Sequence, residues 1–448
     1  MIAATSAACY PGPVERDESR ESATGGRPRA TRRSNAALAT LLLAIAGCGE
    51  AVEPASVDDI DGFWFDITDY GAWRAPTEEQ SAAIRQLEAL GYADGYEAGP
   101  QLTGVLQHAA DACEPGLNLW SSGHAPEAFL MKMDGEIVHT WRHAYGSLPG
   151  AGAMEHHSQN AWRRVRLLPG GDLLAIHEGL GLLKLDRESN LQWYFPGHAH
   201  HDLDLRADGR ILVLTRAARM MPGLHPTEPI FEDSITTLDA DGNVLEQVSL
   251  LACLRDSSYS NALRSASTDG GDILHTNSID ILDAQEARAH PRFEPGHVLV
   301  CFRDLDAIAT VDLERRTVVW MSSGDWIAPH DVSALGPGAL LIFDNMGNET
   351  FSKVLEFDPQ TGSELWSHRG SPAQAFFSIF CGTAARLPGG NTLITESCRG
   401  RVLEVDAQGA VAWEYASPYR AGDRQQFVAA LYEMVRLPAD TSLEWLEH

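Results

Sequence analysis

The chain has 448 residues, of which 44% are hydrophobic and 21% are charged, so it can bury a large core and is not an intrinsically disordered chain. Its formal net charge of −28 excludes nucleic acid and anionic membrane surfaces as favoured partners, because like charges repel. The 40 glycines and 23 prolines suit a protein rich in β-strands and turns.

The first 47 residues resemble the signal sequence of a bacterial lipoprotein. Residues 1–33 are rich in Arg, Ser and Pro, and residues 35–46 form an apolar stretch that is too short to span a bilayer. The run IAGC at 45–48 resembles a lipobox, which predicts lipid attachment at Cys48 and removal of residues 1–47. We therefore expect a periplasmic or cell-surface lipoprotein of a bacterium, membrane-bound through its anchor only, with a mature net charge of −30.

Residues 48–115 are predicted to form a linker followed by a helical extension. An acidic low-complexity run comes directly after Cys48. Residues 77–90 then begin with a Thr suited to an N-cap, carry acidic residues in the first turn and place apolar residues on one helix face before a terminating glycine. This pattern predicts one short helix, to which we assign no chemistry.

One β-rich repeat recurs from residue 116 onward. Its clearest copy, AARLPGGNTLITESCRGRVLEVDAQGAVAWEY at 384–415, consists of four short strands separated by turns that contain Gly. Four further copies begin near residues 165, 201, 275 and 330. Four strands recurring at roughly forty to fifty residues are typical of a β-propeller blade, which must stack on its neighbours to bury both faces.

A sixth copy is split between the two ends of this region. Residues 116–141 contain the last three strands of a repeat, and residues 432–441 contain an opening strand with nothing after it. Pairing of these two segments would close the ring and remove its free edges. The sequence therefore predicts an all-β chain with a six-bladed propeller over residues 116–448. A pair of β-sandwiches or a solenoid would not explain the split repeat.

Five cysteines remain once Cys9 is removed with the signal and Cys48 is lipidated: Cys113, Cys253, Cys301, Cys381 and Cys398. Cys381 and Cys398 flank the first two strands of the last complete repeat, a hairpin whose ends lie close together. We therefore predict a disulfide between these two in the oxidising periplasm. The alternative is that they are small buried hydrophobic residues.

Histidines recur where successive repeats begin. His201 and His330 each stand eight residues before the glycine of the next turn, within the pattern His-Asp-apolar, and His275 lies at a comparable strand start. Equivalent positions of two other repeats hold Arg163 and Gly382. Equivalent positions of a propeller converge at one end of its axis, so these residues are expected to meet in one asymmetric site.

Three interpretations of the histidines compete. They could be structural residues of the axis. His198, His200 and Asp202 match an HxHxD pattern of metal ligands, but the hydrolases that use this pattern have α/β folds. The third interpretation is transfer of an anionic group onto a neutral imidazole, with Arg303 as a forked donor to the oxygens of that group.

Several segments together resemble the arylsulfotransferase family, six-bladed propellers that move a sulfuryl group between phenols. These segments are His275-Thr276-Asn277-Ser278-Ile279, Arg303 followed by Ala307-Ile308 and Asp312, Val319-Trp320, His330-Asp331 and Phe343-Asp344-Asn345. The resemblance implies that His330 is transiently sulfated and that His275, Asn277, Arg303 and His201 are catalytic. It also makes His200, the alternative to His201, and Asn345 candidates for substrate binding. Pro329 and Met346 depart from the family pattern.

The resemblance also implies a mechanism and a set of partners. His330 attacks the sulfur of an aryl sulfate, Arg303 and Asn277 hold the sulfuryl oxygens, and His275 or His201 exchanges a proton with the phenol. We expect a ping-pong reaction with an aryl sulfate and a phenol as substrates, no nucleotide donor, no cofactor and no metal; a homodimer is left open. A non-catalytic binding or scaffolding propeller of the cell envelope is the main alternative.

Overall fold

The computed structural model of the chain describes residues 95–98, 100–151, 160–225, 227–264, 266, 271–347, 351–371, 374–421 and 426–447. The predicted signal sequence, Cys48 and the predicted helix at 77–90 lie outside these residues. All described residues belong to one unit of the chain, residues 57–448. Within the described part, no helix is long and apolar enough to cross a membrane.

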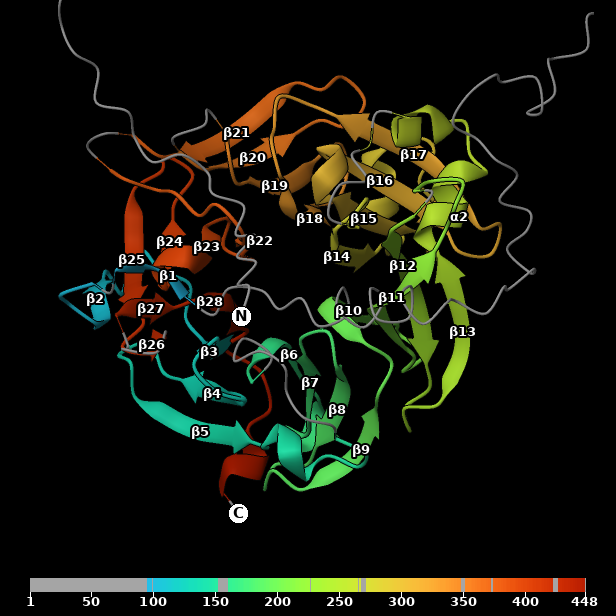
Figure 1. Cartoon of the computed structure of the whole chain (residues 1–448). Helices are drawn as coiled ribbons and strands as arrows, with labels where there is room; N and C mark the ends of the chain where they lie inside the picture. Colours follow the sequence, from blue (N-terminus) through green and yellow to red (C-terminus); the bar gives the residue numbers. More distant parts are fainter. Residues whose placement is uncertain are drawn as a thin grey trace, which may run out of the picture. The chain divides into compact units, whose positions relative to one another are not determined.

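Six antiparallel sheets stand around a common axis as the blades of a β-propeller (Figure 1). The strands of blade 1 are β28 (Leu431–Leu437), β3 (Leu117–Ser122), β4 (Glu127–Met131) and β5 (Ile137–Arg142); of blade 2, β6 (Trp162–Leu167), β7 (Leu173–His177), β8 (Gly181–Leu185) and β9 (Leu191–Phe195); of blade 3, β10 (Ala199–Leu205), β11 (Ile211–Met220), β12 (Pro229–Leu238) and β13 (Val244–Ser249). Those of blade 4 are β14 (Thr276–Ile281), β15 (Val298–Phe302), β16 (Ala307–Asp312) and β17 (Thr317–Ser323); of blade 5, β18 (His330–Ala334), β19 (Leu340–Asp344), β20 (Lys353–Phe357) and β21 (Glu364–Arg369); of blade 6, β22 (Thr383–Arg386), β23 (Thr392–Glu396), β24 (Arg401–Val405), β25 (Val411–Ala416) and β2 (Gly104–His108).

The remaining elements are short. A small sheet consists of β1 (Gly95–Ala98), β27 (Phe427–Ala429) and β26 (Arg420–Ala421). The helical segments are α2 (Leu250–Arg255) and the 3-10 turns Tyr145–Ser147, Pro169–Gly171, Ser260–Arg264, Glu286–Ala289, Arg303–Leu305, Ser397–Arg399 and Glu444–Glu447. The described part of the chain is thus almost entirely β, as the sequence predicted.

Blade 1 closes the ring by joining the two ends of the propeller. Its innermost strand β28 pairs antiparallel with β3, with Leu431 opposite Ser122 and Leu437 opposite Leu117. The predicted six blades and their closure by a split repeat are therefore confirmed. The sheets begin earlier than the predicted residue 116, because β2 adds a fifth strand to blade 6 along β25.

Tryptophans in the fourth strand of the repeat connect neighbouring blades. Each of four such tryptophans donates its indole N–H to a backbone carbonyl in a turn of the next blade. The pairs are Trp141 with Gly171 (3.0 Å), Trp193 with Ala240 (3.0 Å), Trp366 with Ala407 (3.0 Å) and Trp413 with Met133 (2.9 Å). The repeated Trp therefore combines a large buried surface with one satisfied polar group.

The apolar core also lies between blades rather than within them. Leu174 of blade 2 packs in one cluster with Leu203 of blade 3. In the same way, Leu214 of blade 3 belongs to a second cluster that contains Val300 of blade 4. Each buried aliphatic side chain contributes roughly 1.5–3 kcal/mol when it is shielded from water. A single blade would lose this burial, so the six blades depend on one another for stability.

Candidate active site

The innermost strands of five blades carry a bulge near their first residues. The pairing with the second strand shifts at Arg163 in β6, Asn277 in β14 and Tyr432 in β28, and over residues 200–202 in β10 and 331–332 in β18. A bulge bends the strand and changes the direction of a side chain. Because the bulges recur at one level of the propeller, they bring residues from distant parts of the sequence together.

A small cavity lies at this level, and all six blades line it. Its lining residues are Tyr432 of blade 1, Arg163 and Arg164 of blade 2, His201 of blade 3, Asn277 of blade 4, His330 and Asp331 of blade 5, and Cys381, Gly382 and Thr383 at the start of blade 6. The free space is about 10 Å³, which is room for about one water molecule. Of the residues that the sequence predicted to converge, His201, His330, Arg163 and Gly382 line this cavity and His275 does not; Asn277 lines it as well.

The hydrogen bonds of His330 determine which of its ring nitrogens carries a proton. Nδ1 lies 2.7 Å from Oδ1 of Asn345 and 3.2 Å from the carbonyl oxygen of Ala328. The amide of Asn345 is oriented by its Nδ2, which donates to the carbonyl oxygens of Ser378 (2.6 Å) and Cys381 (2.9 Å). Both neighbours of Nδ1 are therefore acceptors, so Nδ1 is the protonated nitrogen of the neutral ring.

The other nitrogen of His330, Nε2, is buried and has no hydrogen-bond partner in the described part of the chain. Burial holds the pKa of His330 well below its usual range, and the positive charges of Arg303, His275 and Arg163 lower it further. The imidazole is thus neutral, with an available lone pair on Nε2. This is the state that a nucleophilic histidine requires.

His200 and His201 form a second histidine pair beside the cavity. Their Nδ1 atoms lie 2.9 Å apart, and Nδ1 of His201 is 3.7 Å from a carboxylate oxygen of Glu178. Burial lowers the pKa of both rings well below the usual range, and nearby charges, from Arg216 for His200 and from Arg163 for His201, act in the same direction. Both rings are therefore neutral, and only His201 of the two lines the cavity.

The structure does not support the metal interpretation of the sequence. Asp202 of the HxHxD pattern accepts hydrogen bonds from the backbone of Leu203 and Ile279 and pairs with Arg164 at 2.9 Å. In the described part of the chain, the groups with metal-ligand spacing are instead Glu178 with His200 and His201, and Asp272 with His275 and Asp304. The cations of Arg163 and Arg216 lie close to the first group and disfavour a further cation there.

His275 and Arg303 lie outside the residues that line the cavity. Nδ1 of His275 is 2.8 Å from a carboxylate oxygen of Asp272, and its ring centroid is 5.1 Å from that of His201. Burial would raise the pKa of Asp272, but the charge and hydrogen bond of His275 lower it to about 2, so this carboxylate is ionised. Arg303 forms an ion pair with Asp304 in the turn between β15 and β16.

Sequence reasoning gave no role in the site to several cavity residues, among them Arg163, Tyr432 and Cys381. The guanidinium carbon of Arg163 lies 4.7 Å from the ring centroid of Tyr432, and its Nη1 donates to Sγ of Cys381 at 3.2 Å. Arg163 is 7% exposed, so its charge acts in a surrounding of low dielectric constant. Its place at a repeat start, equivalent to that of the histidines, was the signal in the sequence that pointed to this site.

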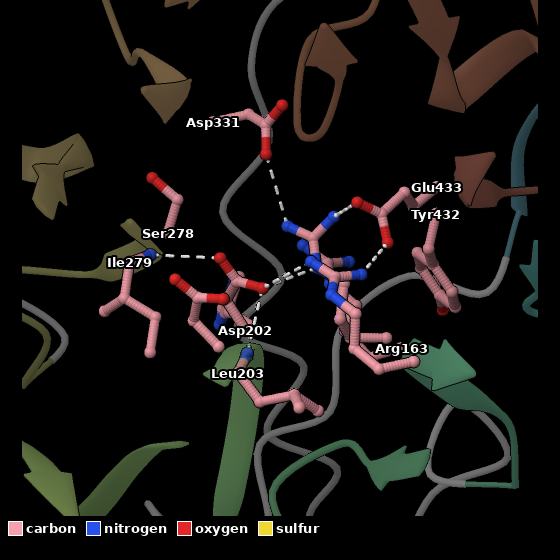
Figure 2. A network of polar contacts seen from close by, with 12 residues as sticks. Arg163, Asp202, Leu203, Ser278, Ile279, Asp331, Tyr432 and Glu433 are labelled. Atoms are coloured by element: carbon pink, nitrogen blue, oxygen red, sulfur yellow. Dashed lines mark hydrogen bonds and ion pairs between the residues drawn. The ribbon is translucent and has the colours of Figure 1, made fainter. Parts of the chain in front are cut away.

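A buried ion-pair network joins the innermost strands beside the cavity, and its members Arg164 and Asp331 also line the cavity (Figure 2). The guanidinium of Arg164 pairs with Asp202 at 2.9 Å, Glu433 at 2.7 Å and Asp331 at 3.4 Å. The carboxylates also bond to the backbone of the next blade: Asp202 to N–H of Ile279, and Asp331 to N–H of Ala384. The Asp of the His-Asp pattern is thus a structural link between blades, whereas the His faces the site.

The predicted disulfide between Cys381 and Cys398 is wrong, because both residues are free thiols in the structure. Sγ of Cys381 accepts the hydrogen bond of Arg163 at the cavity. Cys398 is buried in the turn Ser397–Arg399, where its backbone N–H donates to Oγ of Ser378. Burial raises the pKa of Cys398 to about 11, which fits the alternative expectation of a small buried hydrophobic residue.

Comparison with known protein families places the chain in one of them. The model of the family described as arylsulfotransferase (ASST) matches residues 164–418, which is more than half of the chain. The chain belongs to the arylsulfotransferase family. The match begins at Arg164 and runs past β25, so it contains His201, His275, Asn277, Arg303, His330 and Asn345. It leaves out blade 1 and Arg163, and it supports a sulfotransferase activity in general.

Solved structures resemble the chain only remotely. A protein of unknown function from Bacteroides caccae is 14% identical with a TM-score of 0.46, covering 72% of this chain and 98% of that one. The WD40 β-propeller domain of Doa1 is 13% identical with a TM-score of 0.40, covering 73% and 88%. A streptogramin B lyase is 12% identical with a TM-score of 0.39, covering 72% and 87%. A search of curated proteins found no match.

Proposed function

We propose that the protein transfers a sulfuryl group from an aryl sulfate to a phenolic acceptor in two half-reactions, with His330 carrying the group between them. The observation that carries this proposal is the state of His330: Nδ1 is held by Asn345 at 2.7 Å, while Nε2 has no partner in the described part of the chain. Membership of the arylsulfotransferase family supports it.

In the first half-reaction the lone pair on Nε2 of His330 forms a bond to sulfur. The bond between sulfur and the phenolic oxygen breaks, and the phenolate leaves with the electron pair. We assign charge compensation on the sulfuryl oxygens to Asn277, which lines the cavity, and to Arg303, whose charge acts on His330 from outside the residues that line it. Sulfuryl transfer resembles phosphoryl transfer, in which positioning and electrostatic stabilisation provide most of the catalysis.

The departing phenolate takes a proton from a histidine. His275 is the better donor, because the ionised carboxylate of Asp272 at 2.8 Å can balance its charge, whereas burial keeps His201 neutral. In the second half-reaction an acceptor phenol returns a proton to His275 and attacks sulfur. The bond between nitrogen and sulfur then breaks, and His330 regains its neutral state.

We further propose that this reaction takes place in the bacterial periplasm or on the cell surface, with lipidated Cys48 as the anchor. The donor supplies the sulfuryl group directly, so no nucleotide is consumed. The mature net charge of −30 argues against nucleic acid as a partner. A positive site is therefore needed to attract an anionic substrate, and the guanidinium groups near His330 supply it.

The test uses an aryl sulfate labelled with radioactive sulfur and the full chain. Label should become bound to the wild type and be released by a phenol, and initial rates against both substrates should give parallel lines. His330→Ala should take up no label. His368→Ala is the matched control, because His368 is a buried histidine of the same blade that does not line the cavity. Absence of uptake by the wild type across a broad set of donors would favour the binding-propeller alternative.

A further inference from the structure

We infer that Arg163 is a sulfuryl-binding residue and that a sulfuryl oxygen takes the place of the Cys381 thiol as the acceptor of its hydrogen bond. The inference deepens the proposed function and rests on it for the identity of the anion. The match to the arylsulfotransferase family does not include Arg163, because it begins at residue 164.

The position of Arg163 relative to His330 is the first ground. Both residues line the same cavity, and Arg163 is one of the charges that depress the pKa of His330. The Arg163 side chain is 7% exposed, whereas that of Arg303 is 25% exposed, is paired with Asp304 and does not line the cavity. A sulfuryl group on Nε2 of His330 would therefore lie in the cavity that Arg163 borders.

The charge balance at the cavity is the second ground. Two guanidinium groups line it, and that of Arg164 is engaged by the carboxylates of Asp202, Glu433 and Asp331. Arg163 has the carboxylate of Glu178 at the longer distance of 3.9 Å. Glu178 therefore lies farther from Arg163 than the carboxylates of Asp202 and Glu433 lie from Arg164, in a surrounding that screens charge weakly.

The contact with Cys381 is the third ground. Nη1 of Arg163 donates to Sγ of Cys381 at 3.2 Å, and thiol sulfur is a weak acceptor. An anionic sulfuryl oxygen is a much stronger acceptor for a guanidinium. The cavity has room for about one water, so a sulfuryl group that enters it comes into close contact with the lining side chains. A sulfuryl oxygen at this place would compete with the Cys381 thiol for Nη1 of Arg163.

The ring of Tyr432 completes the arrangement. It lies 4.7 Å from the guanidinium carbon of Arg163 and comes from blade 1, whereas Cys381 comes from the start of blade 6. A cation over an aromatic face is held in place without a competing acceptor. Tyr432 can therefore keep the guanidinium at the cavity when a sulfuryl oxygen replaces the thiol as the acceptor.

The experiment measures two quantities on the full chain: binding of inorganic sulfate by calorimetry, and the rate at which label from an aryl sulfate enters the protein. Arg163→Gln should weaken sulfate binding more than tenfold and slow label uptake by about 10²-fold or more, the usual loss for one oxyanion donor. Arg163→Lys retains the positive charge but not the two-pronged guanidinium donor. Its sulfate affinity and its rate of label uptake should therefore lie between those of the wild type and of Arg163→Gln. The matched control is Arg386→Gln, because Arg386 also pairs with one carboxylate, Glu356, and one aromatic ring, Trp366, but does not line the cavity.

Two substitutions at Cys381 separate the role of its thiol from a structural one. Cys381→Ala removes the competing acceptor and should retain or strengthen sulfate binding, whereas Cys381→Ser introduces a stronger acceptor and should weaken it. Equal weakening by both would overturn the role of the thiol. Circular dichroism and thermal unfolding of each variant identify any that fail to fold, and Arg163→Lys then serves in place of Arg163→Gln.

The outcomes distinguish this inference from the proposed function. If the wild type takes up label and folded Arg163→Gln binds sulfate and takes up label as the wild type does, the inference is overturned and the proposed function stands. If the wild type binds sulfate through Arg163 but takes up no label, the anion site stands and the proposed function fails. A wild type that neither binds sulfate nor takes up label overturns both.

Discussion

Nδ1 of His330 donates a hydrogen bond to Oδ1 of Asn345 at 2.7 Å, and this contact leaves Nε2 as the nitrogen that can react. Asn345 cannot reverse its amide without placing its oxygen against the carbonyl groups of Ser378 and Cys381. The turn that enters blade 6 therefore controls the protonation of a histidine in blade 5. The segment Phe343-Asp344-Asn345, noticed in the sequence as a family pattern, has a specific physical role.

Replacing Asn345 with Ala should have two effects with different causes. It should lower the reactivity of His330, and it should lower the stability of the chain. The ring would lose the acceptor that selects its tautomer, and transfer to His330 should slow by about tenfold or more. The unfolding free energy should fall by about 1–3 kcal/mol for each carbonyl left without a donor. Nitrogen NMR of the histidine ring measures the tautomer, and denaturant unfolding measures stability.

Ser352→Ala is the control for this substitution. Oγ of Ser352 bonds to the backbone of Asn345 and of Ser378 but not to His330, so its loss should lower stability without changing the tautomer. An Asn345→Ala variant that keeps the wild-type tautomer and rate would show that this contact does not govern reactivity.

Asp272→Asn should slow transfer most for donors with poor leaving groups. The amide still accepts the hydrogen bond from His275 but cannot balance a positive charge on that ring, so proton donation to the phenolate becomes harder. Phenyl sulfate should lose about 10-fold to 10²-fold in rate, and 4-nitrophenyl sulfate, whose phenolate needs no proton, should lose much less. Rates over a series of substituted phenyl sulfates check this, and an equal loss for every donor would contradict it.

The stability of the strand that begins with His330 should depend on pH through Asp280. Oδ2 of Asp280 accepts the N–H of Ala334 in β18 at 2.8 Å, and burial raises the pKa of Asp280 from 3.8 to about 8. Between pH 3.8 and about pH 8, Asp280 stays protonated in the folded chain but is ionised in the unfolded chain. The contribution of Asp280 to stability is therefore complete below about pH 4 and is lost as the pH rises to about 8.

Asp280→Asn should remove the loss of stability between about pH 4 and pH 8, because the amide stays neutral and its oxygen can still accept the N–H of Ala334. The unfolding free energy of the variant relative to the wild type should therefore increase from pH 5 to pH 8, as measured by urea unfolding. Asp208→Asn is the control: hydrogen bonds with Arg210 lower the pKa of Asp208 to about 2, so it stays ionised over this range. A difference for Asp280→Asn that does not change with pH would refute the prediction.

A chain that ends at Ala430 should fail to form the closed ring. It lacks β28, so β3 would present an unpaired edge and Arg164 would lose the carboxylate of Glu433. We expect loss of cooperative unfolding and association into larger species, which size-exclusion chromatography and thermal unfolding detect. A chain that ends at Leu437 keeps β28 and should remain folded. A monomeric, cooperatively folded protein ending at Ala430 would mean that closure is dispensable.

Cys48→Ser should release the protein from the membrane fraction. The prediction rests on the lipobox at residues 45–48, and it concerns residues outside those that the structure describes. Fractionation of cells that express the wild type, Cys48→Ser or the control Cys113→Ser is the test. Membrane association that survives Cys48→Ser would rule out this residue as the anchor.

The sequence by itself was sufficient for the architecture. The repeat has Gly, Asp and Trp at fixed positions, because each of them forms a local turn or contacts the next blade. Such a pattern can be recognised in a single sequence. The split repeat predicted the pairing of β28 with β3, and the shared register of His201 and His330 predicted that both reach one cavity.

Only the tertiary structure decided which side chains complete that cavity. The orientations of Arg163, Asn277 and Tyr432 depend on bulges, and the charge available on Arg163 depends on distances to carboxylates of other residues. For the same reason Cys381 bonds to Arg163 and not to Cys398, although the two cysteines are close in sequence. Local patterns specify strands and turns, whereas contacts across the axis join residues that are far apart in the sequence, such as Arg163 and Tyr432, and form only when all six blades close.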